Sequence, residues 1–307
     1  TPSLVPESPT VEQAQQALQR LWQPFKDFPF VGNIDCAVHL AALLTAAVRA
    51  VLPTAPAFGY DAPVQASGKT LLARCVGVLA AGTDPGIWPH TSGRDDEEVR
   101  KRLFTALRSG ARALVWDNVA GIFDSVAMAS LLTSDVYHDR ILGVSISSQV
   151  PNRMLLLMTG NNLSLAGDMA RRVLVARIDP KSDKPFAREF AVDPYAVCVA
   201  DRQSMIAAAL TLIRFYLSAN VGHLGAGRMA SFEQWDDWVR QTVIYVDREL
   251  APGKFGDIME QVKVNQANDP DQESLGALLR SWHLCFGEDA VTAAQVLQKS
   301  HGPFITD

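Results

Sequence analysis

The segment Pro63-Val-Gln-Ala-Ser-Gly-Lys-Thr70 constrains the fold of this chain more than any other feature of its sequence. It matches the second half of the phosphate-binding loop pattern G-x-x-x-x-G-K-[ST], with Pro63 where the first glycine would stand. In that pattern backbone N–H groups surround the phosphates, the lysine reaches the β and γ oxygens, and the hydroxyl ligates Mg²⁺. The helix that follows the loop adds the positive end of its dipole. The expected phosphate-binding residues are Ser67, Gly68, Lys69 and Thr70.

Apolar patterning places strands and helices in alternation around this loop, which is typical of an α/β fold with a parallel sheet. The predicted strands cover residues 57–61, 87–90, 111–116, 154–158 and 173–178, and the predicted helices among them cover 70–81, 95–109, 125–133 and 164–172. Helices are also expected over residues 11–22, 35–51, 203–219, 232–246, 274–286 and 291–300. We therefore predict an N-terminal helical segment (residues 1–54), a nucleotide-binding core (55–180) and a C-terminal helical lid (181–307).

Composition limits the classes of protein that fit. Hydrophobic residues make up 48% of the 307 residues, enough for a sizeable core, and no uninterrupted apolar run reaches the ~20 residues that span a membrane. The net charge of −5 argues against a simple module that coats duplex DNA, but not against a ring with a basic pore. The four cysteines have no paired spacing, so we expect no zinc site, no disulfide framework and a cytoplasmic location.

Asp117 follows the apolar run 113–116, where a predicted strand ends. A phosphate-binding loop needs a second acidic residue at the end of a neighbouring strand to hold Mg²⁺, and Asp117 is expected to share that ion with Thr70. The dipeptide Asp117-Asn118 is also typical of a plain turn, which is the alternative interpretation.

Polar residues follow the later strands as well. One of Asn161 and Asn162 is expected to position the attacking water or to contact the γ-phosphate, although a Gly-Asn turn would explain the same pair. Arg171 and Arg172 precede the last predicted strand. A guanidinium stabilises a transferring phosphoryl group, often from a neighbouring subunit, so one of these arginines predicts a ring with its sites between subunits. A surface salt bridge is the alternative.

Together these motifs resemble the AAA+ type of P-loop ATPase, and more closely the ATPase part of primase/helicase proteins of phages, plasmids and other mobile elements. The resemblance runs from about residue 24 to about residue 287. It is carried by Phe28-Pro-Phe30, Ala55-Pro56, residues 62–70, Trp116-Asp-Asn118, Asp139-Arg-Ile-Leu-Gly143, Thr159-Gly-Asn-Asn-Leu163 and Gly167-Asp-Met-Ala-Arg-Arg172.

The resemblance implies a fold, cofactors and residue roles. It implies a central parallel sheet, ATP and Mg²⁺ as cofactors, and a homo-oligomeric ring, expected to be a hexamer, that acts on single-stranded DNA and not on a membrane. By that likeness Lys69 and Thr70 are Walker A, Asp117 is Walker B, Asn161 or Asn162 is sensor 1, and Arg171 or Arg172 is the arginine finger. Arg202 is expected as sensor 2, with an ordinary surface arginine as the alternative.

In such rings a β-hairpin before sensor 1 enters the pore and grips one DNA strand. Residues 141–146 and 154–158 are expected to flank its tip, residues 147–152. Ser, Gln and Arg side chains can bind phosphates without reading sequence, and a polar surface loop is the alternative. The expected DNA contacts are Arg140, Ser147, Ser148, Gln149 and Arg153.

The sequence departs from this family pattern at two places. Pro63 and Ala66 replace glycines of the loop; proline pre-sets φ, and alanine is unfavourable only if its position needs a positive φ. Asn118 stands where the family has the catalytic glutamate, and an amide can orient a water but is no base. Glu98 or Asp124 could supply the missing carboxylate.

Three functions follow from these observations. The first is an ATP-dependent motor or helicase of a mobile genetic element that moves along DNA as a ring. The second is an AAA+ ATPase that remodels protein partners without binding DNA. The third is a nucleotide-binding scaffold that does not hydrolyse, which is the function that Asn118 favours.

Overall fold

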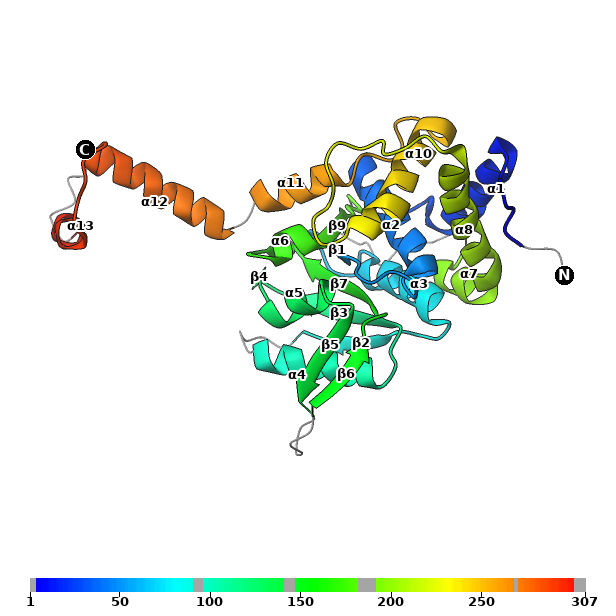
Figure 1. Ribbon diagram of the computed structural model, residues 1–307, viewed down its shortest axis with the longest axis horizontal. Coiled ribbons are helices and arrows are strands. Elements are labelled where there is room, and N and C mark those ends of the chain that lie inside the picture. Colours follow the sequence, from blue (N-terminus) through cyan, green and yellow to red (C-terminus); the bar gives the residue numbers. More distant parts are fainter. Residues whose placement is uncertain (1–3, 91–95, 141–146, 182–191, 268–269, 301–307) are drawn as a thin grey trace.

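Five parallel strands form the central sheet of the computed structural model, in the order β2-β3-β7-β1-β9 (Figure 1). The structure describes residues 4–90, 96–140, 147–181, 192–267 and 270–300. The strands of the sheet are β1 (Ala57–Ala62), β2 (Gly86–Pro89), β3 (Ala113–Val119), β7 (Leu155–Asn161) and β9 (Val173–Arg177). The predicted α/β fold with a central parallel sheet and helices before and after it is confirmed.

The order of the strands decides which residues meet. β7 lies between β1 and β3, so the carboxyl ends of all three strands reach the same edge of the sheet. In register, Ala62 of β1 pairs with Asn161 of β7, and Pro89 of β2 pairs with Asp117 of β3. β1 is buried along its whole length, which is typical of a strand covered on both faces. Ligands of open α/β sheets bind at this carboxyl edge.

Helices pack on the sheet and on one another. The helices of the first part of the chain are α1 (Val11–Trp22), the 3₁₀ turn η1 (Gln23–Phe25), α2 (Asn33–Val48), α3 (Lys69–Ala81), α4 (Asp96–Arg108), α5 (Val126–Leu132) and α6 (Met169–Arg172). α3 packs across β1, β7 and β3, while α2 packs against β9 and α3. Thr10 caps α1, because its hydroxyl accepts the N–H of Gln13 and the Gln13 side chain accepts the N–H of Thr10.

Two small sheets lie outside the central one. β4 (Ile122–Phe123) pairs with β8 (Ser164–Leu165) in parallel, and β5 (Val136–Arg140) pairs with β6 (Ser147–Pro151) in an antiparallel hairpin. Figure 1 shows this hairpin extending beyond the central sheet at the lower edge of the view. The predicted hairpin was therefore misplaced: residues 147–151 form one of its strands and not its tip, and residues 154–158 belong to the central strand β7. Residues 141–146, predicted as the other strand, lie outside the described residues.

The regular elements described in the C-terminal part of the chain are all helical. It comprises α7 (Pro194–Ala200), α8 (Arg202–Ala219), α9 (Glu233–Trp235), the π-helical turn η3 (Asp236–Arg240), α10 (Gln241–Leu250), α11 (Met259–Ala267), α12 (Pro270–Phe286) and α13 (Ala293–Ser300). Trp235 is fully buried, and its indole N–H donates to the Thr45 hydroxyl of α2 at 2.8 Å, so this region joins the main core. The domain boundaries stay predictions.

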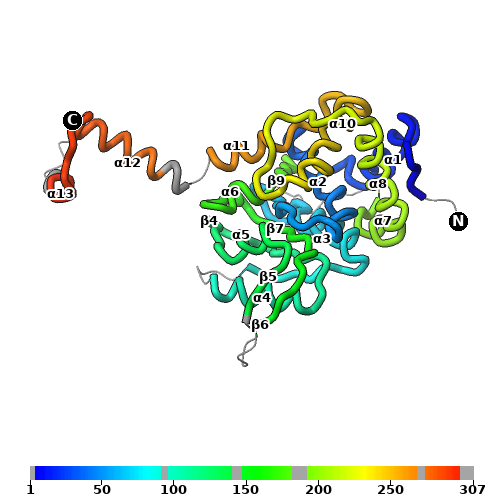
Figure 2. The backbone as a smooth tube through the Cα atoms, viewed as in Figure 1, coloured from blue at the N-terminus to red at the C-terminus, as the bar shows by residue number. Residues whose placement is uncertain are grey.

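The last helices lie apart from the rest of the molecule. Figure 2 traces the chain from α11 out to α12 and α13, at the opposite end of the long axis from α1. The exposed fractions of Leu278 and Leu279 on α12 are both 58%. Among the described residues no single helix is long and apolar enough to cross a bilayer; α7 and α8 meet the length and composition only as a pair, across a bend of 87°.

Candidate nucleotide site

The phosphate-binding loop connects β1 to α3, as the sequence predicts. Gly68 has a φ of 99°, and a Cβ added there would lie 3.1 Å from a ring carbon of Phe28, so both the backbone and the packing call for glycine. Ala66 also has a positive φ, of 57°. A left-handed alanine is unfavourable by roughly 1–2 kcal/mol relative to the right-handed form, so the departure at this position strains the loop.

Lys69, the first residue of α3, lies at the centre of the candidate site. Its ammonium group donates to the carbonyl oxygen of Val64 at 2.9 Å, to Oγ of Ser67 at 3.0 Å and to Oδ1 of Asn161 at 2.7 Å. These three bonds use all three of its protons. Burial lowers the pKa of Lys69 from its ordinary value, and the carboxylates of Asp61 and Asp117 oppose that shift.

Asp117 lies at the end of β3, opposite the start of α3. Its Oδ1 accepts a hydrogen bond from the Thr70 hydroxyl at 2.9 Å and another from the Thr159 hydroxyl at 2.7 Å. A hydroxyl and a carboxylate so close together are hard oxygen donors of the kind that Mg²⁺ takes alongside nucleotide phosphates. The donor set therefore fits the predicted Mg²⁺ site, and among the described residues no cluster of three or more His, Cys, Asp or Glu side chains offers another.

Asn118 lies within β3, at the place where the regular pairing of that strand with β7 is interrupted. It is exposed, its φ is 60°, and the pairing of β3 with β7 shifts register between Trp116 and Val119. Asparagine tolerates this left-handed conformation better than most residues do, which gives Asn118 a conformational role. Of the two alternative carboxylates, Glu98 lies 3.9 Å from Arg102, and Asp124 lies against Gly167. The residue that activates water stays a prediction.

The two asparagines at the end of β7 separate. Asn161 contacts Lys69, so it lies within the cluster. Asn162 has a φ of 52° and begins the turn toward β8. It lines a cavity of about 230 Å³ together with Arg177 of β9 and Gln261 of α11. Asn161 is therefore the residue of the pair that the structure brings to the phosphate-binding loop.

The two arginines of α6 are held differently. The Arg171 side chain is 38% exposed, and it bonds Oδ1 of Asp168 at 2.9 and 2.7 Å. The Arg172 side chain is 11% exposed, and it donates to Oδ2 of Asp168 at 2.7 Å, to the carbonyl of Ala129 and to the Thr133 hydroxyl at 3.4 Å. Arg172 therefore holds the end of α5, while Arg171 stays accessible to a second copy of the chain.

Arg202 does not join the cluster. Its guanidinium donates to the carbonyl oxygens of Leu79 at 2.9 Å and Val78 at 3.2 Å, so it caps the C-terminal end of α3. Lys69 starts the same helix, whose 13 residues extend roughly 20 Å. Arg202 therefore contacts the end of α3 that is far from the phosphate-binding loop.

The predicted DNA-binding residues lie on the β5–β6 hairpin and at its base. Ser147 and Gln149 are exposed and alternate along β6, so they share one face of the ribbon, and Ser148 is half-buried. Arg140 pairs in register with Ser147. Arg153 forms an ion pair with Asp135 at the base of the hairpin and donates to the Asn152 carbonyl at 3.0 Å.

The base of the hairpin is fixed by Asn152 and Arg49. The buried amide of Asn152 donates to the carbonyls of Leu131 at 2.7 Å and Ser134 at 3.1 Å. The buried guanidinium of Arg49 donates to the carbonyls of Asn152 at 2.8 Å and Met154 at 3.0 Å. Burial lowers the pKa of Arg49 to about 10, with Arg153 contributing and Asp135 opposing.

Sequence reasoning missed two residues of the site. Thr159 contacts Asp117, and the buried Asp61 at the end of β1 accepts the Leu163 N–H at 2.8 Å and the Arg177 Nε–H at 3.1 Å. Both stand at the ends of predicted strands next to residues that were singled out. Applying the strand-end rule to every polar residue would have found them.

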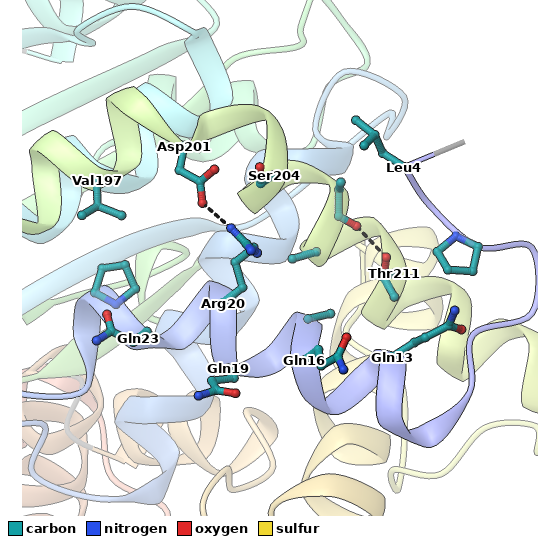
Figure 3. Close-up of a pocket in the computed structure, with 15 residues that line it drawn as sticks. Leu4, Gln13, Gln16, Gln19, Arg20, Gln23, Val197, Asp201, Ser204 and Thr211 are labelled. Carbon is teal, nitrogen blue, oxygen red and sulfur yellow. Dashed lines mark hydrogen bonds and ion pairs between the residues drawn. The ribbon is translucent and has the colours of Figure 1, made fainter. Parts of the chain in front are cut away.

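A cavity of about 740 Å³ lies elsewhere, between α1 and α8 (Figure 3). Glutamines of α1 and the ion pair of Arg20 with Asp201, at 2.7 Å, form part of its wall. Of the described residues that line it, none belongs to the phosphate-binding loop or to the Asp117 cluster. This cavity and the candidate chemistry are therefore separate features of the molecule.

Comparisons with known proteins find only distant similarity. No family model matches the sequence, and no curated protein is similar to it. Two structures of the NrS-1 C-terminal region are similar in fold, at 13% and 12% identity and TM-scores of 0.40 and 0.39. The similar regions cover 69% and 68% of this chain. They cover 48% and 47% of the two NrS-1 chains, so this chain spans about half of their length. The X-ray structure of JCV helicase has 13% identity and a TM-score of 0.33, covering 84% of this chain and 66% of that chain.

Proposed function

We propose that this chain is an ATP-hydrolysing motor of the helicase type that works as a ring on single-stranded DNA. The observation that carries the proposal is the cluster at the carboxyl edge of the sheet. There Lys69 meets Asn161 at 2.7 Å and Thr70 meets Asp117 at 2.9 Å. These residues come from α3, β3 and β7, so the fold, and not a local sequence motif alone, assembles them. The strand order that places β7 beside β1 is what brings Asn161 to the lysine.

Each side chain has a task that its geometry supports. Lys69 would exchange its contacts with Val64 and Asn161 for the β and γ phosphate oxygens of ATP, which bind an ammonium more strongly than neutral acceptors do. The released Asn161 amide would then orient the attacking water or the γ-phosphate. Thr70 and Asp117 would hold Mg²⁺, whose charge neutralises the phosphates. Arg171 of a neighbouring copy would stabilise the transferring phosphoryl group.

The hairpin is the proposed DNA contact. Its exposed face carries Ser147 and Gln149, and its base carries Arg153. Hydroxyl, amide and guanidinium groups bind a phosphate backbone without reading bases. A contact of this kind is salt-dependent and insensitive to sequence.

A second function is favoured by a specific observation. Asn118 is exposed and has a left-handed backbone at the bulge of β3, and no carboxylate is assigned to activate water. A scaffold that binds nucleotide without hydrolysing it would need the same Lys69 and Asp117 contacts. Remodelling of protein partners would need hydrolysis but not the hairpin–DNA contact.

ATPase activity with and without single-stranded DNA separates these functions. The motor predicts turnover that rises with DNA and that Lys69→Ala abolishes, while Lys263→Ala, at an exposed lysine paired with Glu260, changes nothing. Light scattering with a non-hydrolysable ATP analogue should give the mass of a multimer, and electron microscopy of the same sample should show a ring. Turnover that is indifferent to DNA, together with unchanged DNA affinity in a Gln149→Ala/Arg153→Ala variant, would favour remodelling. Nucleotide binding without turnover would favour the scaffold.

A further inference from the structure

We infer that Thr159 is a positioning residue of this site, which fixes the Asp117 carboxylate and the strand bulge at Asp117 and Asn118. The inference rests on the proposed function, because Asp117 matters there as a ligand of the Mg²⁺–nucleotide complex. Thr159 lies in β7, two residues before Asn161, and its exposed fraction is 1%. No water can easily replace a hydroxyl so deeply buried.

The Thr159 hydroxyl makes two hydrogen bonds to consecutive residues of β3. It donates its proton to Oδ1 of Asp117 at 2.7 Å, and its oxygen accepts the backbone N–H of Asn118 at 3.0 Å. A hydroxyl has one proton, so donation to the carboxylate and acceptance from the amide fix its orientation completely. The Thr159 hydroxyl therefore fixes both the orientation of the Asp117 carboxylate and the position of the Asn118 backbone.

These two bonds close a bulge in the sheet. Regular pairing of β3 with β7 runs to Trp116 opposite Met158 and resumes at Val119 opposite Gly160. Two residues of β3, Asp117 and Asn118, thus face the single residue Thr159. Bulges leave one residue unpaired in the ladder and re-aim its neighbours' side chains. Here the threonine hydroxyl takes the backbone N–H that the ladder leaves unpaired.

Gly160 gives independent evidence that the bulge is built into the sequence. A Cβ added at this position would lie 2.9 Å from the carbonyl oxygen of Val119, closer than real Cβ contacts come. The close approach of the bulged strand therefore requires glycine directly after Thr159. Both residues of β7 therefore accommodate the bulge of β3: the Thr159 hydroxyl bonds its free N–H, and the absence of a side chain at Gly160 leaves room for the Val119 carbonyl.

Thr159 and Thr70 share the same carboxylate oxygen but have different tasks. Thr70 is the second residue of α3 and the expected ligand of Mg²⁺. Thr159 lies in the rigid centre of the sheet, so its bond to Asp117 does not depend on the metal. It therefore holds the carboxylate in the orientation that receives the ion, before and after the ion binds.

The test is the Mg²⁺ dependence of nucleotide binding. Thr159→Val keeps the shape of the side chain and removes the hydroxyl. Titration with a fluorescent ATP analogue over a range of Mg²⁺ concentrations should show an apparent Mg²⁺ affinity about tenfold weaker than in the wild type. Binding of the analogue in excess chelator should not change. Thr159→Ser should recover most of the lost affinity, because it retains the hydroxyl.

Controls separate positioning from a loss of stability. Thr211→Val removes another buried hydroxyl, which donates to the Ala207 carbonyl at 2.8 Å within α8, and it should leave the Mg²⁺ dependence intact. Combining Thr159→Val with Asp117→Asn should add little to the effect of Asp117→Asn alone, since Thr159 acts through that carboxylate. If Thr159→Val does not fold, Thr159→Ala compared with Thr159→Ser gives the same contrast.

Two outcomes would overturn the inference, and they can be told apart. A wild type that binds the analogue with strong Mg²⁺ dependence, beside a Thr159→Val variant that equals it, removes the role of Thr159 and leaves the proposed function standing. A wild type that shows no Mg²⁺-dependent binding removes the proposed function, and the role of Thr159 with it.

Discussion

Arg171 and Arg172 stand next to each other, and the structure predicts opposite consequences of removing them. Arg172→Ala breaks the bonds to the Ala129 carbonyl, the Thr133 hydroxyl and Asp168. Two net hydrogen bonds and a half-exposed ion pair contribute about 2–3 kcal/mol together. For a chain of this size that loss lowers the melting temperature by roughly 4–10 °C.

Arg171→Ala should leave the fold nearly unchanged. The side chain pairs only with Asp168 among the contacts that the structure gives it, and both partners are more than a third exposed. Such surface pairs contribute about 0–1 kcal/mol, so the melting temperature should fall by no more than about 3 °C. If Arg171 completes the site of a neighbouring subunit, ATPase activity should fall by roughly 10³-fold or more.

Thermal unfolding followed by circular dichroism measures the first effect, and steady-state ATPase measures the second. A mixing experiment tests whether the arginine acts between subunits. If the site is shared, Lys69→Ala and Arg171→Ala subunits each lack a different half of it, so mixed oligomers should regain part of the activity that neither variant has alone. An Arg172→Ala variant as stable as the wild type would refute the packing argument. An Arg171→Ala variant as active as the wild type would refute the shared site.

Further predictions concern the cores of the lid and the sheet. Arg240 is fully buried and bonds Asp257 through two contacts of 2.8 Å and the buried Asp236 at 3.0 Å, so Arg240→Met should cost about 3–5 kcal/mol in urea unfolding at pH 7. Burial by itself raises the pKa of Asp257. Hydrogen bonds from Arg240 and the Met259 N–H outweigh that effect, so the pKa lies below its ordinary value of 3.8. The stability from this pair is therefore complete above pH of about 4 and is lost as the pH falls through the lowered folded-state pKa, so the wild type and Arg240→Met should converge in acid; a constant difference down to pH 3 would contradict this. Gly160→Ala should destabilise by about 1–3 kcal/mol because of the 2.9 Å approach to the Val119 carbonyl, while Gly276→Ala in the exposed helix α12 should be neutral or slightly stabilising in the same melting experiment.

The sequence was sufficient to predict the elements that bear on the site. A helix over residues 70–81 is confirmed as α3, and strands ending near Asp117 and Asn161 are confirmed as β3 and β7. These predictions succeed because buried parallel strands are continuous apolar runs and because a phosphate-binding loop forces a strand–loop–helix order. Lys69, Thr70, Asp117 and Asn161 could be singled out for the same reason: polar residues at strand ends share one edge.

Features that depend on partners in space could not be predicted in this way. The bulge at Asn118 adds one residue to β3, and nothing in the local pattern marks it except the tolerance of asparagine for a positive φ. The strands of the hairpin are largely exposed, so they lack the apolar alternation that would have revealed their register.

What packs against the face of a helix is equally hard to predict from the sequence. The i, i+4 spacing of Trp282 and Phe286 places both on one face of a helix, but this spacing does not reveal what covers that face. In the structure the two rings contact each other, with their centroids 5.4 Å apart, on a helix whose leucines are exposed. Arg202 was expected as sensor 2 from the family resemblance, and in the structure its guanidinium donates to carbonyl oxygens at the C-terminal end of α3.

The last turn of α5 is hydrogen-bonded by two different parts of the chain. Its terminal carbonyls lack partners within the helix, and they are bonded from two sides: Arg172 of α6 takes the Ala129 carbonyl, and Asn152 at the root of the hairpin takes that of Leu131. A helix of seven residues is too short to bend between them, so it acts as a stiff strut. A shift of α6 that moves Arg172 would therefore act on the root of the hairpin through this one short helix, so α6 and the hairpin are mechanically linked.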